Sequence, residues 1–332
     1  MTTVGIIANP AAGQDIRRLV AHGWNVPAHE KVNILRRVFV GLEAAGVKQI
    51  IAMPDVANLC AAARGGASDD VGFRLLEMSI FNDEGDTGKA VELMAEAGVA
   101  CVVTLGGDGT NRAVAGALGD IPLVPISTGT NNVFPTATEG TVAGLAAGLL
   151  ACGLVDADTV TARSNVLEIH VEESAAEVAL IDVAISKERF VGARAIWDMS
   201  TVHEIFLSRA EPASIGLSAI GAALPMRSMD GRTGLHVRLG PGGRSVVAPV
   251  GPGLIRRVPI SEWSALQVDV PVEISLTPCT IALDGERSLT VRPGQAARVC
   301  LRESGPRVVD PKAAIREASR AGIFTDDTLK VD

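Results

Sequence analysis

The chain is poor in aromatic residues and has no excess of positive charge. Among its 332 residues are 3 tryptophans, 7 phenylalanines and no tyrosine, so aromatic side chains make up only 3%. The formal net charge is −8 and the pI is near 5.3. Nucleic-acid binding requires a dense basic surface, and single strands also require aromatic platforms for base stacking. These shortages argue against a nucleic-acid partner.

Cysteine and metal-type patterns are also scarce. The cysteines are odd in number and scattered, which favours reduced thiols in a cytosolic protein over disulfides. They are Cys60, Cys101, Cys152, Cys279 and Cys300. The five histidines form no pair at the i, i+4 spacing of a zinc-binding helix, and no Ser/His/Asp order stands out. Zinc and hydrolase functions therefore rank low.

Long apolar runs and a leader sequence are missing as well. The most apolar segment, Thr141–Val155, is shorter than the ~20 residues that span a bilayer, and glycines interrupt it, so we expect a buried helix. The N-terminus has no basic region leading into a signal-peptide core. We therefore expect a cytoplasmic protein that binds no membrane. A content of 47% hydrophobic and 20% charged residues indicates a globular chain long enough for two domains.

What the first half does contain is an alternation of strand and helix patterns. Short apolar runs predict strands at Val4–Ala8, Gln49–Met53, Val99–Leu105 and Ile121–Ile126. Helical spacing predicts helices at Val32–Leu42, Val56–Arg64, Thr87–Ala97 and Arg112–Leu118. On the first of these helices, Lys31, Arg36 and Arg37 are expected on the solvent face. The alternation predicts an α/β fold, a Rossmann-like parallel sheet domain over residues 1–157.

The segment Gly106-Gly107-Asp108-Gly109-Thr110 (GGDGT) follows the third of these strands and precedes a helix. Glycines at such a turn let the backbone approach a ligand, and the first amides of a helix attract anions. This combination suits a phosphate, with Asp108 as a base or a Mg²⁺ partner. The alternative is a tight turn that uses Asp-Gly for its geometry.

Two more loops end strands of the same sheet. Asn9-Pro10-Ala11-Ala12-Gly13 follows the first strand, and Ser127-Thr128-Gly129-Thr130-Asn131-Asn132 follows the fourth. The ends of parallel strands form the ligand edge of such a sheet, so small and amide side chains there predict walls of a polar site. Each loop could also be a plain turn.

The pattern changes near Asp156. Alternating strands at Val166–Val171 and Val178–Ile185, followed by many Gly and Pro turns, predict a β-rich (β-sandwich) substrate domain over residues 158–304. Ile281–Glu286 reads as a hairpin turn, or as a place where Glu286 and Asp284 serve catalysis or a Mg²⁺ network. A closing helix at Pro311–Ala321 is expected to pack the C-terminal segment, 305–332, back on the first domain.

The GGDGT sequence resembles the signature shared by NAD kinases, diacylglycerol kinases and sphingosine kinases, and more distantly phosphofructokinases. Within that superfamily, the chain most resembles the NAD-kinase-like group called AcoX, the acetoin catabolism protein X proteins. The resemblance implies ATP, Mg²⁺ and NAD as cofactor and substrates. It also implies catalytic roles for Asp108 and Glu286, a metal role for Asp284, and nucleotide or substrate contacts from three loops and one strand. These contacts are Asn9, Gly13, Gly106, Gly107, Gly109, Thr110, Asn111, Gly129, Thr130, Asn131, Asn132 and Asp182.

The second domain matches the NAD-kinase pattern more weakly. Ala179-Leu180-Ile181-Asp182 stands where that family has Ala-Leu-Asn-Glu, and Glu286 follows the lipid-kinase pattern Asp-Gly-Glu. We expect a homo-oligomeric phosphotransferase, a dimer or tetramer, that moves the ATP γ-phosphoryl group to the ribose 2′-hydroxyl of NAD to give NADP. The alternatives are a diacylglycerol-type lipid kinase and a catalytically silent nucleotide-binding regulator linked to acetoin catabolism.

Overall fold

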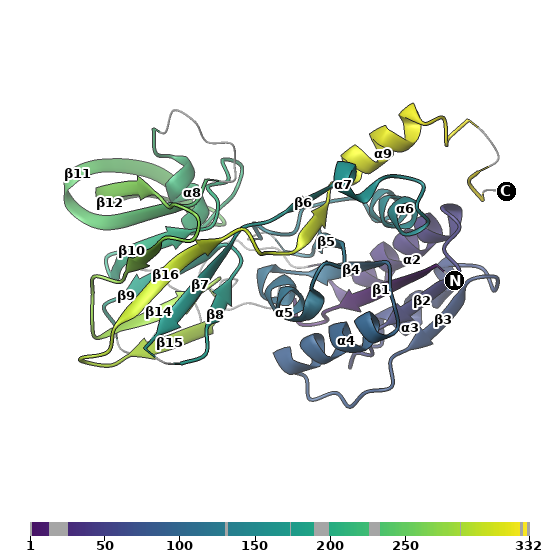
Figure 1. The fold of residues 1–332 in the computed structure, drawn as a ribbon, viewed down its shortest axis with the longest axis horizontal. Coiled ribbons are helices and arrows are strands. Elements are labelled where there is room, and N and C mark those ends of the chain that lie inside the picture. The colour runs from purple at the N-terminus through teal and green to yellow at the C-terminus, as the bar shows by residue number, and fades with distance from the viewer. Residues whose placement is uncertain are drawn as a thin grey trace.

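The chain folds into an α/β part and a β-rich part, which lie on opposite sides of Figure 1. The structure is a computed structural model, and it describes residues 2–12, 26–129, 132–172, 174–188, 199–225, 233–285, 287–325 and 328–330. Within these ranges, no helix combines the length and the apolar character needed to cross a membrane.

The α/β part is built on a seven-stranded sheet with the order β3-β2-β1-β4-β5-β17-β6. Strands β1 to β5 are mutually parallel, as strands separated by helices must be. β17 continues parallel to β5, whereas the edge strand β6 is antiparallel to β17. The strands are β1 (Thr3–Ala8), β2 (Gln49–Ala52), β3 (Gly72–Leu75), β4 (Cys101–Gly106), β5 (Leu123–Ser127), β6 (Thr161–Arg163) and β17 (Arg307–Val309).

Helices cover both faces of this sheet, as the alternation predicted. Apolar side chains of α2 (Ala28–Ala44), α6 (Gly140–Ala151) and α9 (Pro311–Arg320) share one buried cluster with β1 and β4. Those of α4 (Glu84–Glu96) and α5 (Asp108–Leu118) share the cluster on the other face. The remaining helical pieces here are α3 (Leu59–Ala63), η1 (Arg64–Gly66) and α7 (Ala157–Val160).

The apolar segment that begins at Thr141 is a buried helix, as predicted, because α6 lies between the sheet and two other helices. It packs closely on α2: a Cβ atom at Gly144 would lie 2.1 Å from the carbonyl oxygen of Val38. The buried alanines Ala314 and Ala318 of α9 join the same cluster. The end of the chain therefore completes the core of the α/β part.

The β-rich part contains two antiparallel sheets. One has the order β12-β11-β10-β9-β14-β15 and the other β13-β16-β7-β8. Buried side chains of both sheets form a single cluster, including Ile169, Phe206 and Val299, so the sheets pack face to face as a sandwich. The strands are β7 (Val166–Val171), β8 (Glu177–Ala179), β9 (Asp182–Ser186), β10 (Val202–Leu207), β11 (Leu235–Gly251), β12 (Leu254–Ala265), β13 (Pro271–Glu273), β14 (Cys279–Leu283), β15 (Arg287–Val291) and β16 (Ala297–Arg302).

The strand predicted at Val178–Ile185 is two strands, β8 and β9, in different sheets. The break falls at Leu180 and Ile181, whose backbone amides donate to the carboxylate of Asp284 at 2.9 and 2.8 Å. A side-chain acceptor here replaces a neighbouring strand, so the chain can leave one sheet and enter the other.

Two helix boundaries also differ from the sequence expectation. The helix predicted from Val56 begins at Leu59, because the carboxylate of Asp55 accepts the amides of Ala57 and Leu59 and Asn58 is left-handed with φ +51°. The helix predicted from Arg112 begins at Asp108 instead. The last three residues of the signature, Asp108 to Thr110, thus lie in the first turn of α5.

Candidate functional site at the ends of strands β4 and β5

The GGDGT residues join the end of β4 directly to the start of α5. Gly106 is the last residue of β4, Gly107 precedes the helix as its N-cap, and Asp108 is the first helical residue. A Cβ atom at Gly106 would lie 2.6 Å from both Cβ and Oγ1 of Thr110. Glycine is therefore required at position 106, because the side chain of Thr110 folds back over the strand end.

The loop after β5 meets this turn, because β4 and β5 are neighbours in the sheet. Gly106 pairs with Ser127 in the sheet, and the side-chain amide of Asn132 donates to Ser127 Oγ at 2.8 Å. Cβ atoms added at Gly107 and Gly129 would lie 3.0 Å and 3.3 Å from that same amide group. Asn132 thus sits between two glycine turns, facing the strand ends.

Asp108 holds the β5 loop against the start of α5. Both of its carboxylate oxygens lie 3.1 Å from the amide nitrogen of Val133, and Oδ1 accepts the amide of Phe134 at 2.8 Å. Amide donors stabilise the ionised form of a carboxylate. The side chain is therefore a charged group fixed in position at the edge of the sheet.

The Asn9 loop is tied to the same turn. Asn9 Nδ2 donates to Thr110 Oγ1 at 2.9 Å, and the Asn9 amide donates to the carbonyl of Leu105 in β4. The three strand ends, β1, β4 and β5, therefore share one hydrogen-bonded edge.

Lys31 was predicted on the solvent face of α2, but it is only 1% exposed. Its ammonium group donates to the carbonyl oxygens of Asn9, Pro10 and Ala12 at 3.1, 2.9 and 2.9 Å, which uses all three of its donors. Burial lowers its pKa to about 8, and the charge of Asp55 acts in the opposite direction. The helix pattern could not reveal this clamp, because its acceptors are backbone atoms of a different element.

Two predicted contact residues face the protein interior. Asn111 is completely buried; its side chain accepts from Thr104 Oγ1 at 2.7 Å and donates to the carbonyl of Gly107 at 2.8 Å. It therefore ties α5 to β4 and presents no polar atom to a ligand. Gly109 is buried in the first turn of α5 and contributes backbone only.

The side chain of Asp284 is enclosed by protein groups and does not face an open site. It is a left-handed residue, with φ +49°, and its side chain is fully buried. The carboxylate accepts the amides of Leu180, Ile181 and Asp182 and lies 3.6 Å from the Nε of Arg112. Burial raises the pKa of Asp284, while these amides and Arg112 act the other way. No face of this carboxylate is left for a metal ion, which is the physical reason to drop it as a ligand.

Asp182 lies beside Asp284 through the backbone: its amide donates to Asp284 Oδ1 at 3.2 Å, and its carbonyl accepts from the Asp284 amide at 3.0 Å. Gly13, Thr130, Asn131 and Glu286 lie outside the described residues. Among the residues that are described, no group of three or more His, Cys, Asp or Glu side chains could hold a metal ion.

Arg209, which no sequence motif marks, reaches this site from the β-rich part. Its guanidinium carbon lies 5.2 Å from the ring centroid of Phe134, the residue whose amide binds Asp108. Burial lowers the pKa of Arg209, and the charges of Asp108, Glu211 and Asp284 act to raise it. The two parts of the molecule therefore meet at Asp108 with opposite charges.

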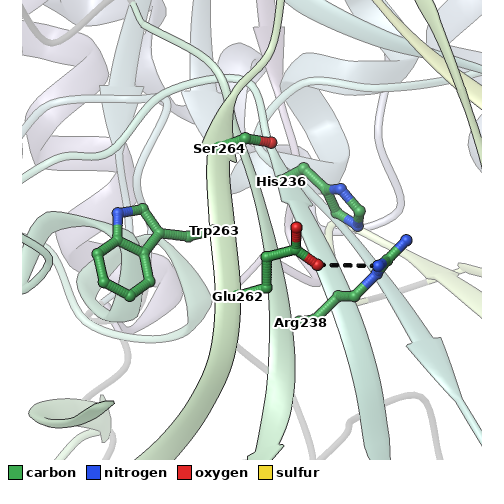
Figure 2. A pocket seen from close by; sticks show the side chains of 5 residues that line it. All are labelled: His236, Arg238, Glu262, Trp263 and Ser264. Atoms are coloured by element: carbon green, nitrogen blue, oxygen red, sulfur yellow. Dashed lines mark hydrogen bonds and ion pairs between the residues drawn. The ribbon is translucent and has the colours of Figure 1, made fainter. Parts of the chain in front are cut away.

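A separate polar pocket lies in the six-stranded sheet, away from these strand ends. Its volume is about 60 Å³, and Figure 2 shows its lining of His236, Arg238, Glu262, Trp263 and Ser264. Arg238 bonds Glu262 at 3.0 Å, as the dashed line marks. Behind it, His236 Nε2 lies 2.7 Å from the buried carboxylate of Glu204. The charged groups of the wall are thus paired with one another or with Glu204, although Nε of Arg238 is buried without a hydrogen-bond partner and lies 3.7 Å from Glu204.

The two halves of the sequence match two family models. Residues 4–154 match the ATP-NAD kinase N-terminal domain, and residues 165–304 match the acetoin catabolism protein X C-terminal domain. Among solved structures, the chain is similar to a candidate diacylglycerol kinase from Bacillus anthracis str. Sterne. That match has 15% identity, a TM-score of 0.47, and coverage of 93% of this chain and 97% of the other.

A curated relative extends over nearly the whole chain. It is the acetoin catabolism protein X of Cupriavidus necator, which is 36% identical over 331 residues, or 96% of this chain and 92% of the relative. The fold is accordingly an NAD-kinase-like domain followed by a β-sandwich, with the GGDGT turn at the edge of the first sheet. The chain belongs to the acetoin catabolism protein X family.

Proposed function

We propose that the protein is an ATP-dependent phosphotransferase that moves the γ-phosphoryl group of ATP to the ribose 2′-hydroxyl of NAD, giving NADP. The observation that carries the proposal is the edge formed by β4 and β5. There Gly106 and Gly107 let the side chains of Thr110 and Asn132 pack directly on the backbone beside the fixed carboxylate of Asp108. The match of residues 4–154 to the ATP-NAD kinase N-terminal domain supports the same reaction.

The residues at this edge fit a phosphate ligand. Side chains at positions 107 and 129 would crowd Asn132, so the two glycines let its amide group lie against both turns, beside the place proposed for the ligand. The first amides of α5 have no acceptor within the helix, and they favour an anion. When bound, Mg²⁺ would neutralise charge on the ATP phosphates, and it needs few protein ligands because it retains waters.

Asp108 is the residue placed to manage the proton. In the proposed step, the 2′-oxygen of NAD forms a bond to the γ-phosphorus while the bond from that phosphorus to the β,γ-bridging oxygen breaks. The electron pair leaves with ADP, and the hydroxyl proton passes to the carboxylate of Asp108. Catalysis of this kind depends on positioning and charge neutralisation, which a carboxylate held by two backbone amides provides.

A second candidate is a catalytically silent nucleotide-binding regulator. It is favoured by the environment of Asp284, which is buried against backbone amides and shows no open face for Mg²⁺. A lipid alcohol as acceptor is less well supported. The exposed large apolar side chains of the described β-rich residues are few, such as Val247 and Ile255, and a membrane-docking surface needs a broad apolar face.

The test is production of NADP by the purified protein and by its Asp108→Asn variant. The Oδ1 atom of Asp108 alone already lies within bonding distance of both amides, Val133 and Phe134, so an asparagine oxygen can keep both bonds. We therefore expect a folded variant with its rate lowered at least ~10²-fold, the loss typical of a missing general base. NADP is measured with an NADP-specific dehydrogenase after incubation with ATP, Mg²⁺ and NAD.

The matched control is Asp310→Asn. Asp310 also caps a helix by accepting two backbone amides, those of Lys312 and Ala313, but it lies at the start of α9. This variant should retain the wild-type rate. Near-normal turnover by the Asp108→Asn variant would remove Asp108 from the mechanism. ATP binding without any product would favour the silent regulator, and product from diacylglycerol alone would favour the lipid kinase.

A further inference from the structure

Arg209 lies at the junction of the two parts, and its guanidinium has no hydrogen-bond or ion-pair partner among the described residues. It follows β10 on the β-rich side and extends over the ring of Phe134 on the α/β side, with 5.2 Å between the guanidinium carbon and the ring centroid. Within the described part of the chain, its guanidinium donates no hydrogen bond and forms no ion pair. Most other partly buried arginines here, such as Arg112 and Arg302, are bonded to carboxylates.

The backbone that carries Arg209 is firmly anchored. The preceding residue, Ser208, donates its amide to the carbonyl of Ile181 at 2.8 Å and its hydroxyl to the carbonyl of Leu180 at 2.5 Å. The carbonyl of Arg209 itself accepts from Ser218 Oγ at 3.2 Å. The side chain is thus held in place by its own backbone and by an aromatic ring, while its N–H donors have no partner among the described residues.

Simple charge neutralisation does not account for this arrangement. If Arg209 served only to offset the charges of Asp108 and Asp284, a direct bidentate pair would be the stable geometry. Asp284 instead pairs with Arg112 and backbone amides, and Asp108 accepts the amides of Val133 and Phe134. Arg209 is partly exposed and burial disfavours its charge, so an anionic ligand that bonds the guanidinium would offset this cost.

We propose that Arg209 binds the phosphoryl group that is transferred, reaching it from the side opposite the GGDGT turn. The planar fork of an arginine matches phosphate oxygens in pairs. As the group passes from ATP to the acceptor, charge on its oxygens is met by Arg209 while Asp108 takes the hydroxyl proton. The guanidinium lies over the ring of Phe134, an arrangement in which N–H groups in the guanidinium plane can still bond oxygens. The inference rests on the proposed phosphotransfer.

The role also concerns how the two parts cooperate. The phosphate-binding turn belongs to the α/β part, whereas Arg209 belongs to the β-rich part. A phosphoryl group held by both would connect them. Neither part alone would then form the complete anion site, which is the arrangement expected of an enzyme that assembles its site when substrate binds.

The experiment compares full-length wild-type protein with Arg209→Gln, Arg209→Lys and a control, Arg238→Gln. Arg238 lies in the same β-rich part, but its guanidinium already bonds Glu262 and it is far along the chain from the signature. The ligands are ATP with Mg²⁺ and inorganic tripolyphosphate, titrated separately by calorimetry. Thermal unfolding is measured for each variant without ligand, and NADP formation is measured as kcat and KM.

We expect Arg209→Gln to weaken binding of both phosphate ligands roughly 10- to 100-fold, as the loss of a charge-assisted hydrogen-bonded pair does. Arg209→Lys should recover part of this loss, because it keeps the charge but not the fork. Arg238→Gln should bind like the wild type. If Arg209→Gln does not fold, the Arg209→Lys variant decides, since a wild-type affinity there contradicts recognition by a paired fork.

Wild-type affinity and kcat in a folded Arg209→Gln variant with a lowered melting temperature would overturn the proposal and leave Arg209 a structural residue. Absence of any binding of ATP and tripolyphosphate by the wild type would overturn it as well. The failure of the proposed function looks different: the wild type binds ATP, Arg209→Gln weakens that binding, and no NADP appears. In that case Arg209 retains its anion-binding role, and only the acceptor is wrong.

Discussion

Gly106 and Gly116 belong to the same strand–turn–helix unit, but their surroundings differ sharply. A Cβ at Gly106 would lie 2.6 Å from Thr110, whereas nothing lies within 4 Å of a Cβ at Gly116 in the middle of α5. The first glycine is imposed by a close contact at the candidate site. The second has no such constraint, and glycine within a helix is unfavourable.

We therefore expect Gly106→Ala and Gly116→Ala to have opposite effects. Gly106→Ala should lower the free energy of unfolding by about 1–3 kcal/mol, the usual result of overpacking, and should weaken ATP binding by shifting the start of α5. Gly116→Ala should raise it by about 0.5–1 kcal/mol and leave ATP binding unchanged. Urea unfolding and ATP titration measure both quantities. Equal stability of the two variants would contradict the close contact described for Thr110.

The ammonium group of Lys31 gives the loop at residues 9–12 a dependence on pH. Its folded pKa is about 8, below the ordinary value of 10.5. Between these values the unfolded chain binds more protons than the folded one, so the contribution of Lys31 to the free energy of unfolding rises with pH. That contribution is fully present above 10.5 and is lost as the pH falls through 8.

The measurable consequence is the difference in unfolding free energy between the wild type and Lys31→Met. We expect it to increase by at least about 1 kcal/mol from pH 8 to pH 10.5. Taking the difference cancels the titration of the buried cysteines, which are the same in both proteins. Lys312→Met, an exposed substitution in α9, serves as control and should give a difference that does not change with pH. A constant difference for Lys31→Met would mean that the lysine is solvated.

Local patterns in the sequence were enough to locate the GGDGT turn and the strands around it, because a buried strand, three glycines and a helix follow one another directly. They could not locate Arg209 or the role of Lys31. Each acts on atoms of another element, Phe134 in one case and the backbone of Asn9 to Ala12 in the other. Such contacts exist only after the chain has folded, and no spacing rule encodes them.

Among the strands, the division of one predicted strand into β8 and β9 also shows that local patterns do not reveal contacts between distant residues. The run Val178–Ile185 has the composition of a single strand. Its interruption comes from Asp284, which is separated by 104 positions from Leu180 and caps the amides at the break. A distant side chain thus redirects a strand whose own residues favour continuation. The sandwich was predictable from the alternating strands, whereas the assignment of each strand to its sheet was not.

Two neighbouring strands, β10 and β11, contribute one residue each to a buried pair, Glu204 and His236. Burial acts to raise the pKa of Glu204, but hydrogen bonds from His236 and Ser275 outweigh it and hold the pKa below the ordinary 4.5. A lowered carboxyl pKa contributes stability above pH 4.5, and that stability is lost as the pH falls further.

We expect Glu204→Gln to be less stable than the wild type by about 1–3 kcal/mol at pH 7, since it leaves buried polar groups with a poorer partner. The difference should shrink as the pH falls below 4.5, which acid unfolding monitored by circular dichroism would show. Glu262→Gln is the matched control: its carboxylate lines the pocket of Figure 2 with His236, the partner of Glu204, but is largely exposed. Exposed pairs contribute little, so this variant should unfold like the wild type at every pH. A pH-independent deficit for Glu204→Gln would contradict the lowered pKa.

At the scale of the whole molecule, the C-terminal helix is part of the core of the α/β part. Ala314 and Ala318 are completely buried in the cluster that α6 and α2 share, whereas the neighbouring Ser319 is exposed. Only small residues fit between α9 and α6 at these positions.

Ala318→Glu should therefore lower the free energy of unfolding by about 3 kcal/mol or more, because it places a charge without a partner in an apolar contact. Ser319→Glu introduces the same side chain one position further on, where it reaches solvent, and should change stability by less than about 0.5 kcal/mol. Thermal and urea unfolding of both variants provide the comparison. Equal unfolding curves for the two would show that α9 does not pack as described.

The place of β17 in the first sheet sets the order in which the molecule can be completed on the ribosome. β17 lies between β5 and β6, yet it follows the whole β-rich part in the sequence. The strand β6 pairs with β17 and not with β5, so it has no place in the sheet until residue 309 has been made. β5 ends at Ser127 and β17 begins at Arg307. During synthesis β5 therefore remains an open sheet edge while the sandwich emerges, and the nascent chain must protect that edge for the time needed to translate about 180 residues, at 5–20 residues per second.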